Sequence, residues 1–402
     1  MIDIEQALQQ LLNHCQPVTG SERLTLDQCL GRTLAGAIIA PLDSPPFDNS
    51  AMDGYAIISS DIPDQGQRSL TINQTIAAGD CGTTLSSGQA ARILTGAPIP
   101  PGADCVVIQE DCQVNNNQIT LSGPVKSGAN IRPAGDDIRR GSTVLSQGLR
   151  LQPQHIAVAA SLGLSELPVQ RSLRVATLTT GDELLNPGQP LGPGQIYNSN
   201  QATLTALLQT YRCEIIDYGI LADDQTLIED TLSKAAASAD LIISSGGVSV
   251  GDRDYLKAAV EKLGQLELWR IAIKPGKPMA FGHIQSTPFF GLPGNPVSLF
   301  ITFMLLVRPY LLRLQGSIEV DITPIRAKAR FEHCGPKHRQ EYLRARLQRE
   351  TNGENSVIIY PNQGSAVLSS ASWADCLAII PKNSHINEGM AVDVIPLSVL
   401  FR

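Results

Sequence analysis

Three glycine-bearing loops in the second half of the chain are well suited to binding an anion. They are residues 179–183 (TTGDE), 244–252 (SSGGVSVGD) and 292–298 (LPGNPVS). Glycine lets backbone N–H groups approach an oxyanion closely, and a helix start adds its positive dipole end. A single such loop would be weak evidence, because turns between strands and helices often contain glycine for geometry alone. Three of them on one sheet edge predict an anion-binding site.

Carboxylates accompany these loops. Asp182, Glu183, Asp252 and Asp254 are hard oxygen ligands that could hold Mg²⁺ against phosphate oxygens. Taken singly, each could equally be a carboxylate that favours the N-terminus of a helix.

A pair of lysines supplies the opposite charge. Lys274 and Lys277 belong to a K-P-G-K-P turn, in which prolines around a glycine stiffen the backbone. A stiff lysine pair suits a phosphate or another oxyanion, and the alternative is a solvated hairpin tip.

An upstream segment, residues 45–56 (PPFDNSAMDGYA), has an unusual composition. Its prolines and turn formers make it neither a plausible strand nor a plausible helix. It also carries the apolar residues Phe47, Met52 and Tyr55, together with the carboxylate of Asp53. This composition indicates an ordered functional loop, with a linker pinned by aromatic residues as an equal alternative.

Composition excludes several classes of protein. The net charge of −7 over 402 residues argues against a general nucleic-acid binder. Eight cysteines form no CxxC pair and six histidines show no metal spacing, which favours reduced thiols in a cytoplasmic protein. The apolar stretch 298–307 is too short to span a bilayer, and no signal peptide is evident. No P-loop and no Ser/His/Asp or Cys/His constellation stands out.

The helices and strands that must position these residues are indicated by the pattern of apolar and polar residues, which changes along the chain. Residues 173–320 alternate strands with helices, which predicts a doubly wound parallel sheet. The expected strands are 174–179, 214–218 and 241–244, and the expected helices are 199–211, 223–237 and 255–263. We expect Ser199 or Asn200 to cap the first of these helices, and Asn295 to cap a later one that has Pro296 in its first position.

The rest of the chain has a different pattern of helices and strands from the α/β segment. Helices flank a β-rich segment in the first half, and β patterns return after residue 320. An N-terminal helix is predicted to begin with a capping box made by Asp3 and Gln6. The expected domains are residues 1–45 plus 142–172 (helical and discontinuous), 46–141 (β-rich and inserted), 173–320 (α/β) and 321–402 (a small β domain).

The ordered set of motifs resembles the molybdopterin molybdenumtransferase family, whose animal member is the gephyrin E domain. The resemblance covers essentially the whole chain. It implies a central molybdopterin-binding α/β domain and a small C-terminal domain like a β-barrel. The motifs are 45–57, 93–98 (ILTGAP), 131–138 (IRPAGDDI), 180–184 (TGDEL), 244–249 (SSGGVS), 273–278 (IKPGKP) and 292–298 (LPGNPVS).

This resemblance implies an activity. Members of the family take adenylylated molybdopterin and molybdate, hydrolyse the adenylyl link with Mg²⁺, release AMP and leave molybdenum on the dithiolene. The resemblance also implies a cytoplasmic homodimer, in which the β-rich domain of one subunit faces the pterin domain of the other. Transient contacts with other cofactor-biosynthesis proteins are expected, but no nucleic acid or membrane. A non-catalytic scaffold and a hydrolase that shares the pterin domain are the alternatives.

The resemblance also assigns residues. The implied catalytic residues are Asp53, Thr95, Asp137, Glu183, Lys274 and Lys277. The implied ligand-binding residues are Arg132, Gly181, Asp182, Asp223, Ser245, Gly246, Gly247, Ser249, Asp254, Arg270, Pro293, Asn295, Pro296 and Ser298. Glu183, Asp252 and Asp254 are the implied Mg²⁺ ligands. Arg270 departs from the lysine that is often found there, so a compact donor becomes a planar fork.

A cluster of basic residues in the C-terminal β domain has two interpretations. It could bind a partner, but a solvated face is favoured. Its members are Arg326, Lys328, Arg330, Lys337, Arg339, Arg344, Arg346 and Arg349.

Overall fold

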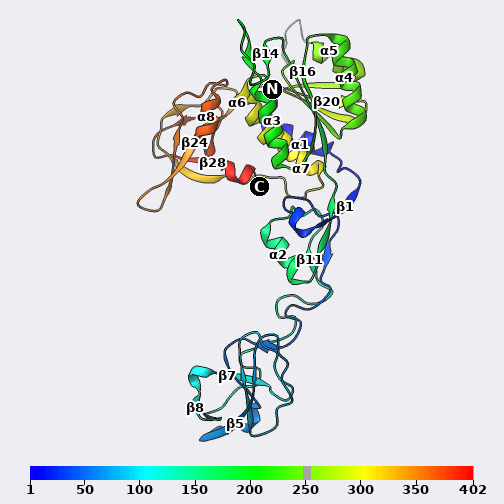
Figure 1. The fold of residues 1–402 in the computed structure, drawn as a ribbon. Coiled ribbons are helices and arrows are strands. Elements are labelled where there is room, and N and C mark those ends of the chain that lie inside the picture. The colour runs from blue at the N-terminus through cyan, green and yellow to red at the C-terminus, as the bar shows by residue number, and fades with distance from the viewer. Residues whose placement is uncertain (248–254, 402) are drawn as a thin grey trace. The chain divides into compact units, whose positions relative to one another are not determined.

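The computed structural model describes residues 1–247 and 255–401, with the backbone alone for residues 268 and 269. The chain forms two compact units (Figure 1). Unit 1 comprises residues 1–35, 148–152 and 167–402, and unit 2 comprises 36–147 and 153–166. The four domain boundaries expected from the sequence stay a prediction.

A six-stranded sheet forms the centre of unit 1. In spatial order its strands are β16 (Glu214–Leu221), β13 (Arg174–Thr180), β17 (Leu241–Ser245), β21 (Thr287–Leu292), β20 (Pro278–Ile284) and β18 (Gly264–Arg270). The first four are parallel, and three of them, β16, β13 and β17, had been predicted as parallel strands. Strand β20 runs antiparallel to both of its neighbours, β21 and β18, and neither β20 nor β18 had been expected from the sequence. The carboxyl ends of the parallel strands therefore lie at one edge of the sheet.

Helices cover both faces of this sheet, which confirms the doubly wound arrangement (Figure 1). Residues alternate along each strand, so that Val175 and Ile243 pack on one side while Ala176 and Ile242 pack on the other. The first side is covered by α1 (Ile4–Asn13), α3 (Ser199–Thr210), α6 (Pro296–Thr302) and α7 (Arg308–Leu314). The second side is covered by α4 (Gln225–Ser238) and α5 (Tyr255–Leu263).

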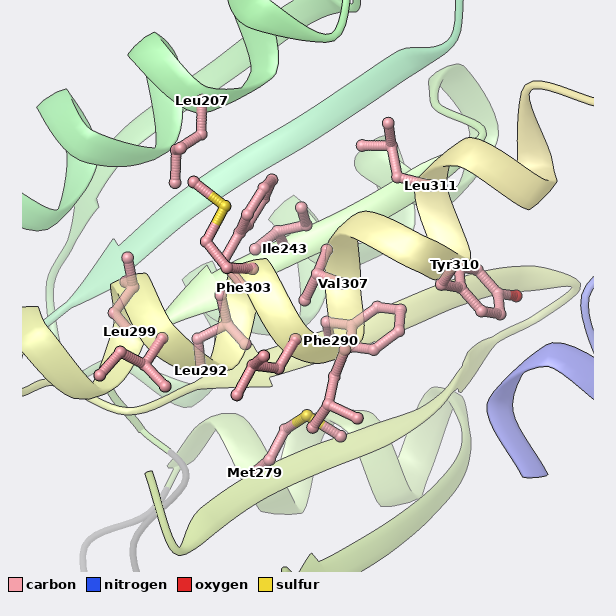
Figure 2. Close-up of a cluster of buried hydrophobic side chains, with 14 of the residues drawn as sticks. Leu207, Ile243, Met279, Phe290, Leu292, Leu299, Phe303, Val307, Tyr310 and Leu311 are labelled. Atoms are coloured by element: carbon pink, nitrogen blue, oxygen red, sulfur yellow. The ribbon is translucent and has the colours of Figure 1, made fainter. Parts of the chain in front are cut away.

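The largest hydrophobic core lies between the sheet and the run from α6 to α7 (Figure 2). A π-helical turn, Phe303–Val307, joins these two helices. Phe290 of β21 meets Tyr310 of α7 edge to face at 5.2 Å between ring centroids. Such a pair is worth about 0.5–1.5 kcal/mol beyond its buried area. The core thus fixes α6, whose N-terminus borders the candidate site.

The continuous helical run Pro296–Leu314 is long and apolar enough to cross a membrane by length and composition. However, 89% of the most apolar 18-residue stretch of this run is buried inside the protein, as in the core helix of a globular domain. The run is longer than the apolar stretch 298–307 considered in the sequence, because it continues through Arg308 and Pro309.

The C-terminal part of unit 1 is a closed five-stranded barrel, as the resemblance implied. Its strands are β22 (Ile325–Ala329), β24 (Gln340–Arg349), β25 (Asn355–Ile359), β26 (Cys376–Ile380) and β28 (Ala391–Pro396). The barrel closes because β24 pairs with both β25 and β26. A short strand, β19 (Ile273–Lys274), pairs with β24 and joins the lysine turn to the barrel.

Smaller elements complete unit 1. They are β1 (Ser21–Thr25), η1 (Leu26–Gln28), β12 (Glu166–Gln170), β14 (Leu184–Leu185), β15 (Ile196–Tyr197), β23 (His333–Cys334), α8 (Leu368–Trp373), β27 (His385–Ile386) and α9 (Leu397–Leu400). Strand β1 pairs with β12, β14 with β15 and β23 with β27.

Unit 2 is β-rich, as predicted. Its main sheet has the order β7 (Cys105–Ile108), β4 (Gly54–Ile57), β6 (Gln89–Ile93), β5 (Gln67–Ile76), β9 (Gln118–Ser122) and β8 (Gln113–Asn115). Two short ladders join β3 (Asn49–Ser50) to β10 (Ile131–Arg132) and β2 (Ile38–Ile39) to β11 (Thr143–Leu145). The remaining elements are α2 (Pro153–Ser161), η2 (Ser59–Asp61) and η3 (Gln109–Asp111).

The exclusion of strand structure from residues 45–56 was wrong. The segment contains β3, and its end forms β4, which lies between β6 and β7 with all four residues buried. Gly54 signalled a turn, but it is needed because a Cβ there would lie 2.1 Å from the Val107 carbonyl oxygen. The glycine therefore permits close approach of two strands.

The predicted helix caps were partly wrong. Asp3 precedes α1 but makes no side-chain cap, and instead its carboxylate binds Lys382. The cap of α3 is Asn198, whose side chain accepts from the Gln201 N–H, and not Ser199 or Asn200. Asn295 and Pro296 do occupy the predicted positions at the start of α6, although the Asn295 side chain makes no capping hydrogen bond.

Candidate functional site

A cavity of about 440 Å³ lies where the parallel strands β13, β17 and β21 end. Each of the three predicted loops contributes to its wall. The lining residues are Thr180, Glu183, Leu184, Ile196, Asn200, Ser245, Gly246, Gly247, Pro278, Pro293, Gly294 and Asn295. The predicted grouping of the three loops is therefore confirmed for the described residues.

Glycine is required in the loop after β17. Gly246 and Gly247 have φ angles of +87° and +64°, which L side chains rarely adopt. A Cβ on Gly246 would also lie 2.8 Å from the Thr180 carbonyl oxygen. The Gly246 N–H donates to the Leu292 carbonyl at 3.1 Å, which joins this loop to the end of β21. The positive φ angles and the close backbone contact thus explain why these two residues are glycines. The same backbone conformation brings the backbone groups of two loops to the cavity.

Asn200 is a cavity residue that the sequence analysis assigned only as a possible helix cap. Its Nδ2 donates to Ser245 Oγ at 2.8 Å and to the Gly294 carbonyl at 2.7 Å. The side chain therefore joins the loop after β17 to the loop after β21. The only available signal was its position in the N-S-N triplet at the start of α3, which equally predicts a cap.

Glu183 provides a carboxylate to the cavity wall. Its side chain folds back over Gly181, where a Cβ would lie 2.7 Å from Glu183 Oε2. Within residues 1–247 and 255–401, no cluster of three or more His, Cys, Asp or Glu side chains could hold a metal. The predicted ligands Asp252 and Asp254, and the predicted contact Ser249, lie outside the described residues.

The lysine turn is rigid, but its two ammonium groups differ. Gly276 has φ +111°, and a Cβ there would lie 2.5 Å from Thr302 Oγ1, so the turn packs tightly against α6. Lys274 Nζ lies 2.7 Å from Glu341 Oε1, and His333 Nε2 donates to the other oxygen at 2.8 Å. Lys277, in contrast, is exposed. Neither lysine lines the cavity, although Pro278 at the end of the turn does.

Glu341 could not have been singled out from the sequence. Its side chain is only 2% exposed, and burial of a carboxylate is costly unless it is paired. It faces Lys274 because the two residues are register partners of β24 and β19. The contact therefore depends on the pairing of segments 67 positions apart in the sequence.

The other predicted residues of unit 1 that the structure describes do not line the cavity, and they fall into two groups. Pro296 and Ser298 lie in the first turn of α6, directly after the lining residue Asn295. Gly181 and the exposed residues Asp182, Asp223 and Arg270 lie near strand ends.

A second group of predicted residues meets in unit 2. The segments 45–57, 93–98 and 131–138 come together, because Ser50 exchanges backbone hydrogen bonds with Gly96 and Ala97 while β3 pairs with β10. Asp48 Oδ1 also accepts from the Ala134 N–H at 2.7 Å. The predicted residues Asp53, Thr95, Arg132 and Asp137 are all exposed on these segments.

Asp53 is held by one neighbour. Its Oδ1 accepts from the Thr95 backbone N–H at 2.7 Å and from the Thr95 hydroxyl at 2.8 Å. The backbone bond, followed by the hydroxyl bond, holds the pKa of Asp53 below its usual value. The carboxylate therefore stays ionised and fixed in direction while it remains exposed.

The predicted basic cluster is not one solvated face. Arg344 is buried, donating to Ser370 Oγ and to the Gly364 carbonyl, and burial lowers its pKa to about 10. Arg326, Lys328 and Arg330 form ion pairs with carboxylates on the barrel surface. Paired carboxylates thus offset the charge of three members of the cluster.

Comparison with known families accounts for nearly the whole chain. Residues 2–163 match the family model "MoeA N-terminal region (domain I and II)" and residues 326–397 match "MoeA C-terminal region (domain IV)". Between them, residues 176–313 match "Probable molybdopterin binding domain", and this range includes the cavity-lining residues of the three loops.

Individual relatives match from end to end. A protein of Haemophilus influenzae named molybdopterin molybdenumtransferase is 39% identical, with 100% of both chains covered. One from Nostoc with the same name is 39% identical over 92% of this chain and 87% of its own. The solved structure of the molybdopterin biosynthesis moeA protein from Pyrococcus horikoshii OT3 has a TM-score of 0.84 at 30% identity, covering 98% of this chain and 100% of that one. The chain belongs to the molybdopterin molybdenumtransferase family of enzymes, in agreement with the motifs that first indicated it.

Proposed function

We propose that this enzyme inserts molybdenum into molybdopterin, using adenylylated molybdopterin and molybdate with Mg²⁺ and releasing AMP. One observation carries the proposal. The three predicted anion loops line a single cavity inside the part of the chain that matches a molybdopterin-binding domain. Relatives that carry the name molybdopterin molybdenumtransferase support the same activity.

The donor groups of the site suit these substrates. Molybdate is an oxyanion, so the protein needs N–H donors and cations for it, while the pterin's own sulfurs hold the metal at the end. The glycine loops offer backbone N–H groups, and the first turn of α6 adds a positive dipole end. Lys277 supplies an exposed ammonium on a stiff turn whose last residue, Pro278, reaches the cavity.

The carboxylate of Glu183 fits a Mg²⁺ ion. Magnesium is commonly bound through one or two carboxylates together with substrate phosphates, and Glu183 lies on the wall of the cavity. Asp252 and Asp254 are the further ligands that the sequence suggests. When bound, Mg²⁺ would neutralise charge that develops on the phosphate oxygens.

The residues of the chain would act mainly by positioning and by electrostatic stabilisation. When a molybdate oxygen attacks the adenylyl phosphorus, the P–O bond to the pterin's phosphate would break, and negative charge would grow on the phosphate oxygens. The dithiolene sulfurs would then take the molybdenum from the adenylyl molybdate, AMP would leave with the bridging oxygen, and the thiol protons would leave with a second molybdate oxygen as water. The N–H groups of the glycine loops and the ammonium of Lys277 would stabilise the charge on the phosphate oxygens. Lys274 would contribute less, because Glu341 already offsets its charge.

Asp53 would act from a second subunit. We infer a homodimer in which the Asp53 cluster of unit 2 serves the cavity of the partner chain, with Thr95, Arg132 and Asp137 beside it. The exposure of Asp53 and its rigid hydrogen bonds to Thr95 support this role. We also propose that the enzyme works in the cytoplasm, where its eight free cysteines would stay reduced.

An assay of AMP release separates this function from its alternatives. Purified protein would be mixed with adenylyl-molybdopterin and Mg²⁺, with and without molybdate. AMP release that depends on molybdate supports insertion. Release at the same rate without molybdate would favour a hydrolase, and tight binding of the pterin without release would favour a scaffold.

A further inference from the structure

Asn200 occupies an unusual position in the cavity. It is the second residue of α3 and only 8% exposed, yet it lines the space between the loops after β17 and β21. Its two N–H donors are both used, one on Ser245 Oγ and the other on the Gly294 carbonyl. An amide is the side chain that suits this position, because a carbonyl acceptor needs a donor and a carboxylate offers none.

Within residues 1–247 and 255–401, one backbone hydrogen bond also joins the two loops. The Gly246 N–H binds the Leu292 carbonyl at 3.1 Å near the base of the loops. Beside this bond, the neighbour of Gly294 is another glycine, since a Cβ on Gly294 would meet only the Gly246 Cα, at 4.0 Å. Neither glycine has a side chain that could bridge the two loops. The amide of Asn200 bridges them through its hydrogen bonds to Ser245 and Gly294.

A second feature of Asn200 points to a ligand. Its Oδ1 is buried and has no hydrogen-bond partner within the described part of the chain. A buried acceptor without a partner costs about 1–3 kcal/mol, and natural proteins rarely keep one without a functional reason. The neighbouring Asn198 is buried to a similar degree, but both ends of its amide are satisfied, by Gln201 N–H and by Thr179 Oγ1.

We propose that Asn200 is a positioning residue for the adenylylated pterin. It would hold the loop after β17 and the loop after β21 at the spacing at which their backbone groups bind the substrate's phosphates. The inference rests on the proposed function, because it takes that substrate for this cavity. It goes beyond the family motifs, since Asn200 belongs to none of the segments that carry the resemblance.

The test compares Asn200→Ala with Asn198→Ala as a matched control. Both changes remove a buried amide with two partners at the start of α3, so both should lower the urea midpoint of unfolding. Only Asn200→Ala should raise the KM for adenylyl-molybdopterin, by about 10- to 100-fold for the loss of two hydrogen bonds. A KM within about twofold of wild type, or an equal rise in Asn198→Ala, would overturn the proposal.

A second variant covers the case in which Asn200→Ala does not fold. Ser245→Ala removes one of the two ties with little change in volume, and it should raise KM by about 3- to 10-fold. If Asn200→Ala does fold, the double variant Asn200→Ala/Ser245→Ala should have the same KM as Asn200→Ala, because the hydrogen bond between the two side chains is already lost. Additive effects of the two changes on KM would contradict a shared hydrogen bond.

Binding of molybdopterin alone keeps this proposal separate from the proposed function. If the wild-type protein binds molybdopterin but releases no AMP, the proposed function fails. The loss of molybdopterin affinity in Asn200→Ala, against Asn198→Ala, then still supports or overturns the role of Asn200.

Discussion

Lys274 Nζ lies 2.7 Å from Glu341 Oε1, and this ion pair joins the lysine turn to the C-terminal barrel. The two partners differ sharply in exposure, at 42% for the Lys274 side chain and 2% for that of Glu341. Removal of Lys274 and removal of Glu341 therefore leave charges in different environments. Without Glu341, water can solvate the remaining ammonium. Without Lys274, the buried carboxylate keeps His333 as its one remaining ion-pair partner among the described residues.

This asymmetry predicts an order of stabilities. Lys274→Ala should lower the free energy of unfolding by about 3 kcal/mol, and Glu341→Ala by under about 2 kcal/mol. Urea unfolding of both variants would measure the difference. Equal losses, or a larger loss in Glu341→Ala, would show that the pair does not control the burial of the carboxylate.

The pKa of Asp53 gives a second prediction. Thr95→Val removes the hydroxyl donor and keeps the backbone donor, so the pKa of Asp53 should rise but stay below its usual value. If ionised Asp53 is needed, the acid limb of the rate against pH should move to higher pH. Thr95→Ser keeps the hydroxyl and serves as the control with an unmoved limb. A limb that stays in place in Thr95→Val would separate Asp53 from the titration.

Two neighbouring glycines should respond differently to alanine. Gly246→Ala puts a side chain at φ +87° and 2.8 Å from a carbonyl oxygen, and the left-handed backbone alone costs about 1–2 kcal/mol. Gly294→Ala meets only one atom, at 4.0 Å, and should leave the unfolding free energy nearly unchanged. Thermal or urea unfolding would compare them. Similar losses for both would contradict the tight approach of Gly246 to Thr180.

Mixed dimers test whether the active site is shared. Asp53→Ala and Glu183→Ala should each be inactive alone, because each destroys both sites of a symmetric dimer. When the two variants are unfolded together and refolded, half of the random dimers should hold one intact site, giving roughly a quarter of wild-type activity. A mixture as inactive as either parent would place both residues in the same chain's site.

Local chemistry explains what the sequence could predict. The glycine loops were recognisable because positive φ angles and close backbone approach require glycine wherever the rest of the chain lies. The alternation of strands and helices in residues 173–320 likewise predicted the parallel strands β13, β16 and β17, because burial on two faces needs continuous apolar runs. The antiparallel strands β18 and β20 were missed, because their sequences carry no comparably clear pattern.

Contacts between distant segments explain what the sequence could not predict. Asn200 meets Gly294 across 94 positions, and Glu341 meets Lys274 only through the pairing of β24 with β19. Neither residue has a local sequence context that distinguishes it from a helix cap or a surface carboxylate. Strand β4 was missed for the opposite reason, since Asp53-Gly54 is a strong local turn signal that the surrounding sheet overrides.

The most direct test of molybdenum insertion measures its two products together. Adenylyl-molybdopterin, molybdate and Mg²⁺ would be incubated with the wild-type protein, and AMP and dithiolene-bound molybdenum would be measured in the same sample. We expect AMP and bound molybdenum to rise together in equal amounts, and neither to form without molybdate. AMP that accumulates without bound molybdenum, or that forms equally well without molybdate, would contradict molybdenum insertion.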